Sequence, residues 1–160
     1  VGSEMCIRDR YPDIVYICIG YGDEEENLKK LVIELKLEKY VFFLNDISNE
    51  LKNALIAKSD VFIMPSIIYK SSVEGFGISF IEAAQYGIPS IGGKDGGASD
   101  AIEHDKSGLI CDGNSLDEIY SSICLMFENN KHLEYGRNAK EKVPNFYWSN
   151  IIDQYSKILN

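Results

Sequence analysis

The sequence predicts an α/β fold built as a doubly wound parallel sheet. Short continuous apolar runs, typical of strands within a parallel sheet, alternate along the chain with longer segments of helical periodicity. This alternation favours parallel pairing, because parallel strands need a crossover connection between them. Glycine, proline or polar residues follow the runs, as expected where strands end in loops. The predicted strands are residues 14–19, 40–44, 60–64, a strand opening at 90–91, and 108–111.

The first strand, residues 14–19, ends at Gly20, which marks either a tight turn or a close approach of the backbone to a ligand. Three acidic residues then open a helix that runs to about Leu35, where negative charge suits the helix dipole. We interpret these acids as capping and surface residues. The second strand, residues 40–44, ends at Asn45.

The central part of the chain holds the clearest local signals. Ser48 or Asn49 can cap a helix over residues 50–58, whose apolar face packs on the sheet. The apolar run at 60–64 predicts a strand buried on both faces. A helix over residues 78–86 follows, because Gly87 suits a helix C-terminus and the next proline stops any continuation.

The last part of the chain continues the pattern. A short strand at 108–111 precedes a helix at 116–127, whose apolar residues recur at helical spacing. Further helices are predicted at 133–142 and 150–159, joined through Pro144. His104 lies in a polar turn and is interpreted as a solvent-exposed side chain.

Composition indicates a single soluble domain with no nucleic-acid role. The 160 residues carry 16 Lys and Arg against 25 Asp and Glu, a net charge of −9, which disfavours binding to phosphate backbones. No apolar run approaches the ~18 residues of a membrane span. We expect a cytoplasmic protein, with peripheral association at the inner membrane face left open. Reduced thiols are expected at Cys18, Cys111 and Cys124.

The first ten residues do not follow the pattern of the rest. Residues 1–9 look like the conceptual translation of a sequencing adapter, so we interpret residues 1–10 as a non-native leader. The domain itself is predicted to cover residues 11–160 and to be incomplete at its N-terminus.

A candidate ligand site lies on the loop and helix after the strand at 60–64. In open parallel sheets, ligands bind beyond the carboxyl ends of the strands, where Glu74 falls. Gly75 and Gly77 allow a tight backbone, and the helix start at Ile78 offers unpaired N–H groups to a phosphate. Glu82 lies on the first turns of the same helix. Carboxylates can bind the hydroxyl groups of a ligand, and backbone amides can bind its phosphates. Both kinds of group side by side therefore suit a nucleotide-sugar.

The stretch from Glu74 to Ala83 resembles the two-glutamate motif of the retaining family-4 glycosyltransferases, in the C-terminal, Rossmann-like half of the GT-B fold. The resemblance implies that Glu74 contacts the donor sugar and acts in catalysis, and that Glu82 binds the ribose hydroxyls. Further matches in the same order are Gly20-Tyr21-Gly22, Val41-Phe42-Phe43-Leu44, Asp60 to Ser66, Gly87-Ile88-Pro89-Ser90, Gly96-Gly97 and Ser107-Gly108-Leu109-Ile110.

The same resemblance implies further donor contacts. The amides of Phe76, Gly77 and Ile78 would face the sugar and diphosphate, Gly20 would approach the donor, and Asn45 lies in the loop that cradles the nucleobase. The family has glycine where Asn45 and its neighbour stand, so the base is left open.

The glycine loop after the strand at 90–91 could line the phosphate or sugar, or could be a simple connector. Lys94, in that loop, is a cation in the same neighbourhood that could contact phosphate.

The resemblance implies sugar transfer from a nucleotide-sugar with retention of the anomeric configuration, in a hexosyltransferase-type parent enzyme. No aspartate pair of the kind that binds a metal diphosphate occurs, so we expect metal independence and no cofactor beyond the donor substrate. The family's basic pair and first strand–helix unit have no counterpart here. We therefore expect this chain alone to be inactive and marginally stable, with an uncovered apolar cleft in its sheet.

Two alternatives stay open. A GT-B nucleotide-sugar epimerase would need further acid–base groups in the cleft. A non-catalytic, flavodoxin-like ligand-binding or regulatory domain would explain the sheet but not the paired glutamates. The expected partners are the donor, an acceptor that is a glycan, lipid or small molecule, and the missing N-terminal domain of the same protein. The donor sugar, the nucleobase and the oligomeric state are left open.

Overall fold

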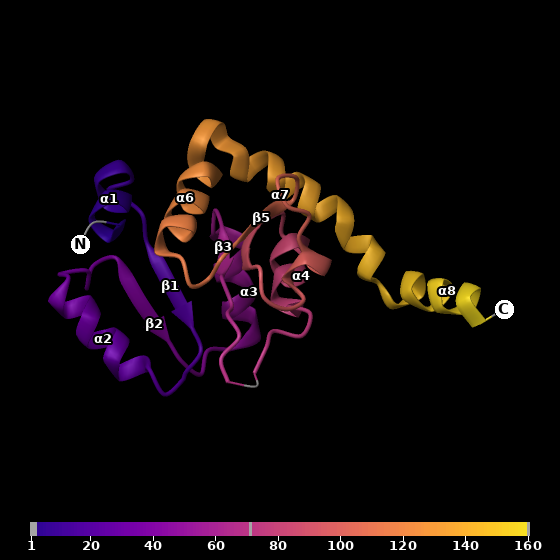
Figure 1. The fold of residues 1–160 in the computed structure, drawn as a ribbon, viewed down its shortest axis with the longest axis horizontal. Coiled ribbons are helices and arrows are strands. Elements are labelled where there is room, and N and C mark those ends of the chain that lie inside the picture. The colour runs from indigo at the N-terminus through magenta and orange to yellow at the C-terminus, as the bar shows by residue number, and fades with distance from the viewer. Residues whose placement is uncertain (1–2, 71, 160) are drawn as a thin grey trace. The chain divides into compact units, whose positions relative to one another are not determined.

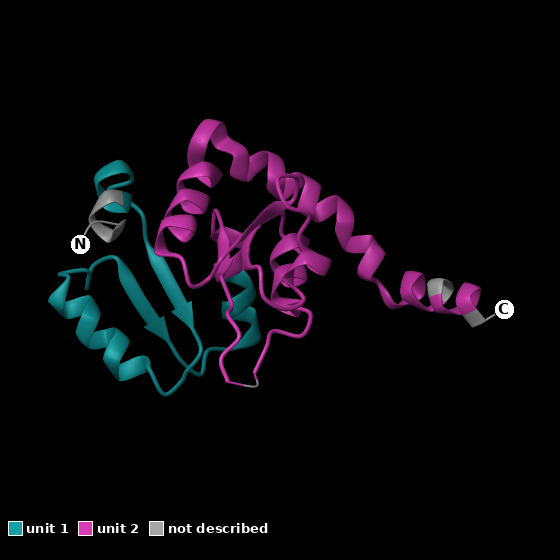
Figure 2. Ribbon diagram, viewed as in Figure 1, with its two compact units in different colours: residues 1–54 teal, residues 55–160 magenta. Residues whose placement is uncertain are grey.

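The structure is a computed structural model that describes residues 3–70 and 72–159. The chain divides into two compact units, residues 1–54 and 55–160 (Figure 2). Strands and helices alternate through both units, as Figure 1 shows. All hydrogen-bonded strand pairs among the named strands are parallel, so the predicted fold class is confirmed.

The first unit is a parallel strand–helix–strand arrangement. Its elements are α1 (Ser3–Arg10), β1 (Tyr16–Ile19), α2 (Glu25–Glu34), β2 (Val41–Leu44) and the start of α3 (Asn49–Lys58). β1 pairs with β2, with Cys18 opposite Phe43. Three of the four β1 side chains are exposed although all are apolar or aromatic. The expected uncovered apolar cleft stays a prediction.

The second unit is a three-stranded parallel sheet with helices around it. Its strands are β3 (Phe62–Met64), β4 (Ser90–Gly93) and β5 (Gly108–Cys111), in the order β3-β4-β5. The helices after β3 are α4 (Ile78–Gln85), α5 (Ala98–Ala101), α6 (Leu116–Phe127), α7 (Lys131–Lys142) and α8 (Trp148–Leu159), with the short 3₁₀ helices η1 (Glu128–Asn130) and η2 (Val143–Phe146).

The predicted burial of β3 on both faces is wrong. Its three residues are only half-buried, whereas all four residues of β4 are buried. β4 lies between two neighbours and β3 is an edge strand, but β5 is also an edge strand and three of its four residues are buried, so edge position alone does not explain the exposure of β3.

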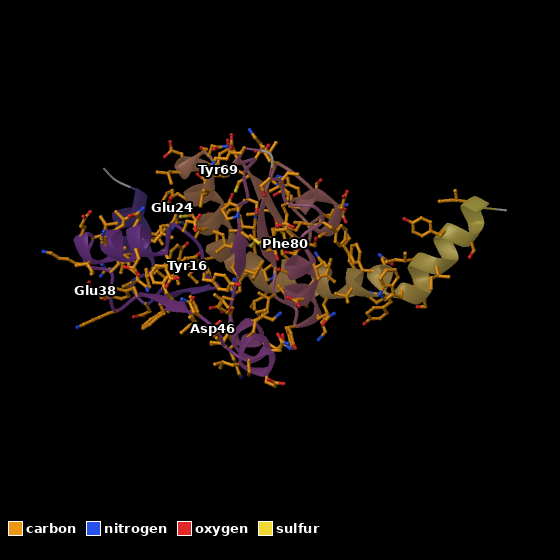
Figure 3. The ribbon with its side chains drawn as sticks, turned by 90° about the horizontal axis from the view of Figure 1, so that it is seen from below. Tyr16, Glu24, Glu38, Asp46, Tyr69 and Phe80 are labelled. Atoms are coloured by element: carbon orange, nitrogen blue, oxygen red, sulfur yellow. The ribbon has the colours of Figure 1, made fainter. Side chains whose placement is uncertain are left out.

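Two apolar clusters pack on β4. One joins Phe80 and Ile81 of α4 to residues of α5, α7 and η2. The other surrounds Ile91, which has no exposed surface, and includes residues of β5, α6 and α7. Within the first cluster, Phe80 is 2% exposed and meets the Phe62 ring edge-to-face with centroids 5.9 Å apart. Figure 3 labels Phe80 and Tyr69, which lies on the loop that precedes α4 and is exposed.

The helix boundaries follow local sequence signals. α6 occupies its predicted residues, and Ser115 caps it by accepting the N–H of Glu118 at 3.2 Å. Gly87 adopts φ +76° directly after the C-terminal cap of α4, which confirms the predicted helix end. α7 and α8 each begin two residues before their predicted starts at 133 and 150. Three short helices, α5, η1 and η2, were not predicted.

The turn between α5 and β5 is tied down by polar contacts. The Glu103 carboxylate pairs with Lys106 and with Lys142 of α7, the latter at 3.2 Å. These lysines hold the pKa of Glu103 below its ordinary value, Lys106 contributing most. His104 is exposed as predicted, and its Nδ1 accepts the N–H of Ile110 at 2.9 Å, so it also has a structural contact.

Residues 3–10, which belong to the predicted leader, form α1, and the Arg8 guanidinium lies over the Tyr40 ring at 4.0 Å from its centroid. The origin of residues 1–10 stays a prediction. Among the helices in the described part of the chain, none combines the length and the apolar character that a membrane crossing requires.

Candidate functional site

The N-terminus of α4 provides the backbone amides of the candidate site. Gly77, the residue before the helix, is buried and has a left-handed backbone with φ +76°. The N–H of Phe80 donates to Gly77 O at 2.9 Å. Within the described residues, the N–H groups of Gly77, Ile78 and Ser79 make no backbone hydrogen bond. Ile78 is 70% exposed. The helix start can therefore accept an anion.

The two predicted carboxylates flank these amides along the chain. Glu74 lies on the loop before α4 and Glu82 lies within the helix, and both are half-buried. The backbone of Glu74 is fixed by its carbonyl oxygen, which accepts the N–H of Gly97 at 3.0 Å. The ring of Phe76 meets the Phe146 ring at 5.7 Å between centroids. All five predicted residues from Glu74 to Glu82 thus lie on one loop–helix segment of the second unit.

The other two predicted donor-binding residues lie in the first unit, at the carboxyl ends of β1 and β2. The Gly20 N–H donates to Leu44 O at 3.1 Å, with φ +127° at Gly20. The Asn45 side-chain amide donates to both carboxylate oxygens of Glu25, at 2.8 and 3.0 Å. The NH₂ group of Asn45 is therefore already engaged within the protein.

Glu25 has a larger structural role than the sequence indicated. Besides Asn45, it pairs with Lys29 at 2.7 Å, one helical turn along α2. Hydrogen bonds from Lys29 and then from Asn45 lower the pKa of this carboxylate. We interpreted the acids at 24–26 as capping and surface residues, but Glu25 links α2 to the loop after β2. Contacts between residues 20 positions apart leave no local signal in a single sequence.

Lys94, after β4, forms an ion pair with Asp112, which directly follows β5. Its ammonium lies 2.6 Å from Asp112 Oδ2, so the carboxyl ends of β4 and β5 are joined by an ion pair. The Asp112 carboxylate also accepts the N–H of Asn114 at 2.8 Å. The Lys94 hydrogen bond lowers the pKa of Asp112, and Asp112 in turn raises the pKa of Lys94. This intramolecular pairing competes with any phosphate for Lys94.

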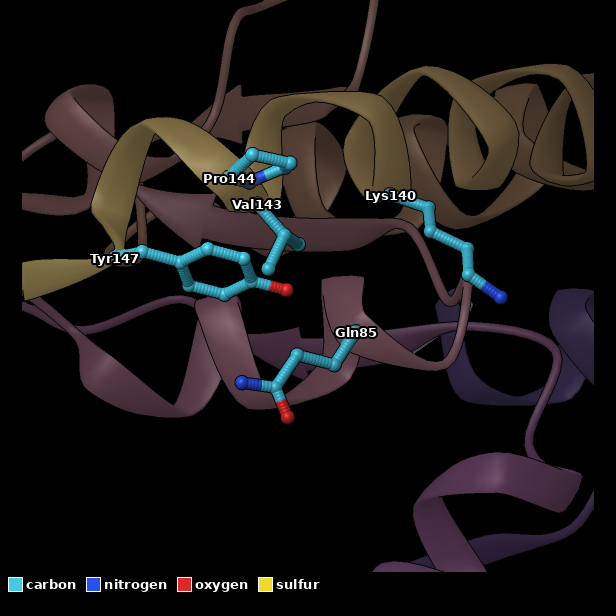
Figure 4. Close-up of a pocket in the computed structure, with 5 residues that line it drawn as sticks. All are labelled: Gln85, Lys140, Val143, Pro144 and Tyr147. Atoms are coloured by element: carbon cyan, nitrogen blue, oxygen red, sulfur yellow. The ribbon is translucent and has the colours of Figure 1, made fainter. Parts of the chain in front are cut away.

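A surface pocket of about 470 Å³ lies elsewhere, where α4, α7 and η2 meet (Figure 4). Its lining residues are Gln85, Lys140, Val143, Pro144 and Tyr147, and no predicted site residue is among them. The candidate site is therefore defined by the loop–helix segment and not by this pocket. In the described part of the chain, no group of three or more His, Cys, Asp or Glu residues is placed to hold a metal ion.

The parallel α/β fold is of the kind found in GT-B glycosyltransferases, and comparison with known proteins identifies the family. Residues 5–143 match the family described as glycosyl transferases group 1. The chain belongs to this family, which confirms the resemblance carried by the two-glutamate motif. The match favours a transferase over the flavodoxin-like alternative.

Curated relatives support this placement over most of the chain. The GDP-mannose-dependent alpha-(1-6)-phosphatidylinositol monomannoside mannosyltransferase of Mycobacterium tuberculosis is 32% identical over 140 residues, covering 86% of this chain and 36% of the relative. The D-inositol 3-phosphate glycosyltransferase of Pseudarthrobacter chlorophenolicus is 30% identical over 154 residues, covering 93% and 36%. The chain thus spans little more than a third of the length of these relatives.

Solved structures show the same fold. HepE of Anabaena in complex with UDP aligns with a TM-score of 0.76 and 25% identity, covering 92% of this chain and 41% of that one. Sucrose-phosphate synthase of Thermosynechococcus elongatus aligns with a TM-score of 0.79 and 21% identity, covering 98% and 40%.

Proposed function

We propose that the full-length protein transfers a sugar from a nucleotide-sugar donor to an acceptor, with retention of the anomeric configuration, and that this chain supplies the donor-binding half. The observation that carries the proposal is the α4 N-terminus. Among the described residues, the N–H groups of Gly77, Ile78 and Ser79 make no backbone hydrogen bond there, and they stand between Glu74 and Glu82 along the chain. The relatives add support, because one is named as GDP-mannose-dependent and HepE was solved with UDP and with UDP-glucose.

The chemistry follows from where charge develops during transfer. As the bond to the sugar breaks, negative charge builds on the leaving diphosphate, and the α4 amides and helix dipole stabilise it. Positive charge develops at the anomeric carbon, and the Glu74 carboxylate orients the sugar and balances that charge. Glu82 would bind the ribose hydroxyls. Donor contacts by Gly20 and Asn45, which lie in the first unit, stay predictions from the family resemblance. No metal ion is required in this mechanism.

The first experiment is a donor panel with the full-length protein. Turnover is measured with UDP- and GDP-linked sugars, and the anomeric configuration of the product is read from its NMR couplings. We expect turnover with one donor class, a retained anomer, and no loss of rate in EDTA. An inverted anomer would refute the mechanism, and strong inhibition by EDTA would refute metal independence.

The role of Glu74 is tested by Glu74→Gln in the full-length protein. Removing a group that stabilises charge only in the transition state costs about 10²–10³ in turnover, so we expect a loss of that order with little change in thermal stability. Glu128→Gln, which changes an exposed glutamate in η1, is the matched control and should behave as wild type. Wild-type turnover in Glu74→Gln would exclude the proposed role.

A further inference from the structure

The glycine loop, residues 93–97, lies directly against the segment that carries Glu74. The Gly97 N–H donates to Glu74 O at 3.0 Å, and Gly97 itself is buried. A Cβ atom at Gly97 would lie 2.7 Å from the carbonyl carbon of Gly75 and 2.8 Å from Cα of Phe76. Such separations are shorter than van der Waals contact, so no side chain fits at Gly97.

Gly96 faces the same segment. Its backbone has φ +90°, a conformation that residues other than glycine rarely adopt. A Cβ atom here would lie 3.0 Å from Cγ2 of Val73 and 3.2 Å from the carbonyl carbon of Glu74, and would overlap the Glu74 carbonyl oxygen. Both glycines therefore present bare backbone to residues 73–76.

The glycine loop is itself anchored at both ends. At its start, the N–H of Lys94 donates to Cys111 O at 2.8 Å, and the Lys94 ammonium pairs with Asp112. At its end, Gly97 O accepts the N–H of Asp100, which is in the first turn of α5. Both loops carry exposed residues, Val73 and Phe76 in the loop before α4, and Lys94 and Gly96 in the glycine loop. The bonds at its two ends allow the glycine loop to hold the backbone of Glu74.

We infer that Gly96 and Gly97 are positioning residues for Glu74 that act by holding the backbone of its segment, and that the Gly97 N–H does not line a phosphate. This inference rests on the proposed function for what Glu74 does. The decisive observation is that the Gly97 N–H is already donated to the Glu74 carbonyl, so it is not available to a ligand oxygen. Because neither glycine has a side chain, the glycine loop can also pack directly against the backbone of residues 73–76.

The first test needs no variant and no activity. Hydrogen exchange of the Gly97 amide is measured in the full-length protein without donor, by NMR. The inference predicts exchange at least about tenfold slower than in an unstructured peptide, because the amide is bonded within the protein. A Gly97 amide that exchanges freely without donor and becomes protected only when UDP is added would mark a ligand-lining loop and would overturn the inference.

The second test separates positioning from stability. Gly97→Ala is compared with Gly92→Ala, a control at a crowded glycine that faces core side chains and not the Glu74 segment. A Cβ atom at Gly92 would lie 2.8 Å from Cδ1 of Ile102 and 2.9 Å from Cβ of Ala98. Misplacing a catalytic group by about 1 Å can cost about 10² in rate. We expect Gly97→Ala to lose about that factor in kcat with donor KM within about threefold, and Gly92→Ala to lose stability but keep the kcat of its folded fraction.

The third test places both glycine variants in a Glu74→Gln background. If Gly97 acts through Glu74, Gly97→Ala should reduce kcat by less than about threefold in this background, because the carboxylate that Gly97 positions has already been replaced by an amide. A full 10²-fold loss in that background would overturn the inference. If Glu74→Gln alone has wild-type turnover, the proposed function fails, and the exchange of the Gly97 amide still decides whether the loop is held in place.

Discussion

Replacing Phe80 by alanine should destabilise the second unit by about 4 kcal/mol. Phe80 is 2% exposed, so the substitution removes a fully buried ring from the core. Burying a Phe side chain stabilises a fold by up to about 3 kcal/mol. The edge-to-face contact with Phe62 adds about 1 kcal/mol. The sum lies within the range of about 3–5 kcal/mol that Phe-to-Ala changes cost in protein cores.

Hydrogen exchange in the full-length protein is the suitable assay, because a multidomain protein seldom unfolds in one step. The amides of Ile91 and Leu109 lie in the buried centre of the sheet and report the opening of this unit. A loss of about 4 kcal/mol should accelerate their exchange about 10³-fold, since about 1.4 kcal/mol corresponds to a factor of ten. Leu133→Ala, at a position 59% exposed on α7, is the control and should change exchange less than about threefold. An acceleration below about tenfold in Phe80→Ala would refute the assignment of Phe80 to the centre of the core.

Three further predictions concern stability. The two lysine partners of Glu103 lower its pKa in the folded state, so its contribution to folding stability is present above the ordinary glutamate pKa and is lost as pH falls through the lowered value. In acid denaturation, the stability of Glu103→Gln should therefore depend less steeply on pH below about pH 4 than that of the wild type. An unchanged slope would contradict this. Ser115→Ala removes the cap of α6 and should cost about 1 kcal/mol in chemical denaturation, whereas Ser121→Ala, exposed within the same helix, should cost far less; equal losses would argue against the cap. Gly87→Ala forces a Cβ into a left-handed backbone and should lower stability by about 1–2 kcal/mol, measured against Gly22→Ala, where a Cβ meets open space; a neutral Gly87→Ala would exclude this strain.

Sequence reasoning succeeded where the signal is local. The α6 boundaries follow from apolar residues at helical spacing, and the α4 end follows from Gly87 and the proline after it. The candidate site could be proposed for the same reason, since Glu74 and Glu82 lie on one short contiguous segment. The roles of the individual site residues stay predictions.

Features that depend on distant partners could not be predicted in this way. An apolar run such as that of β3 indicates a strand, but how deeply the strand is buried depends on packing by distant parts of the chain. The four residues of α5 are too few to show helical periodicity. The contacts of Asn45 with Glu25 and of Lys94 with Asp112 join residues 20 and 18 positions apart, and charge type alone does not select a partner at that separation.

The ion pair between Lys94 and Asp112 makes ionic strength a variable that donor titrations must hold constant. The Lys94 side chain is 55% exposed, so dissolved salt screens its attraction to Asp112. Nucleotide-sugars are added as multivalent salts, and each addition raises the ionic strength of the solution. A shift in the glycine loop during such a titration could then arise from screening of this pair as well as from donor occupancy. Adding sodium chloride in matched steps, without donor, isolates the first effect.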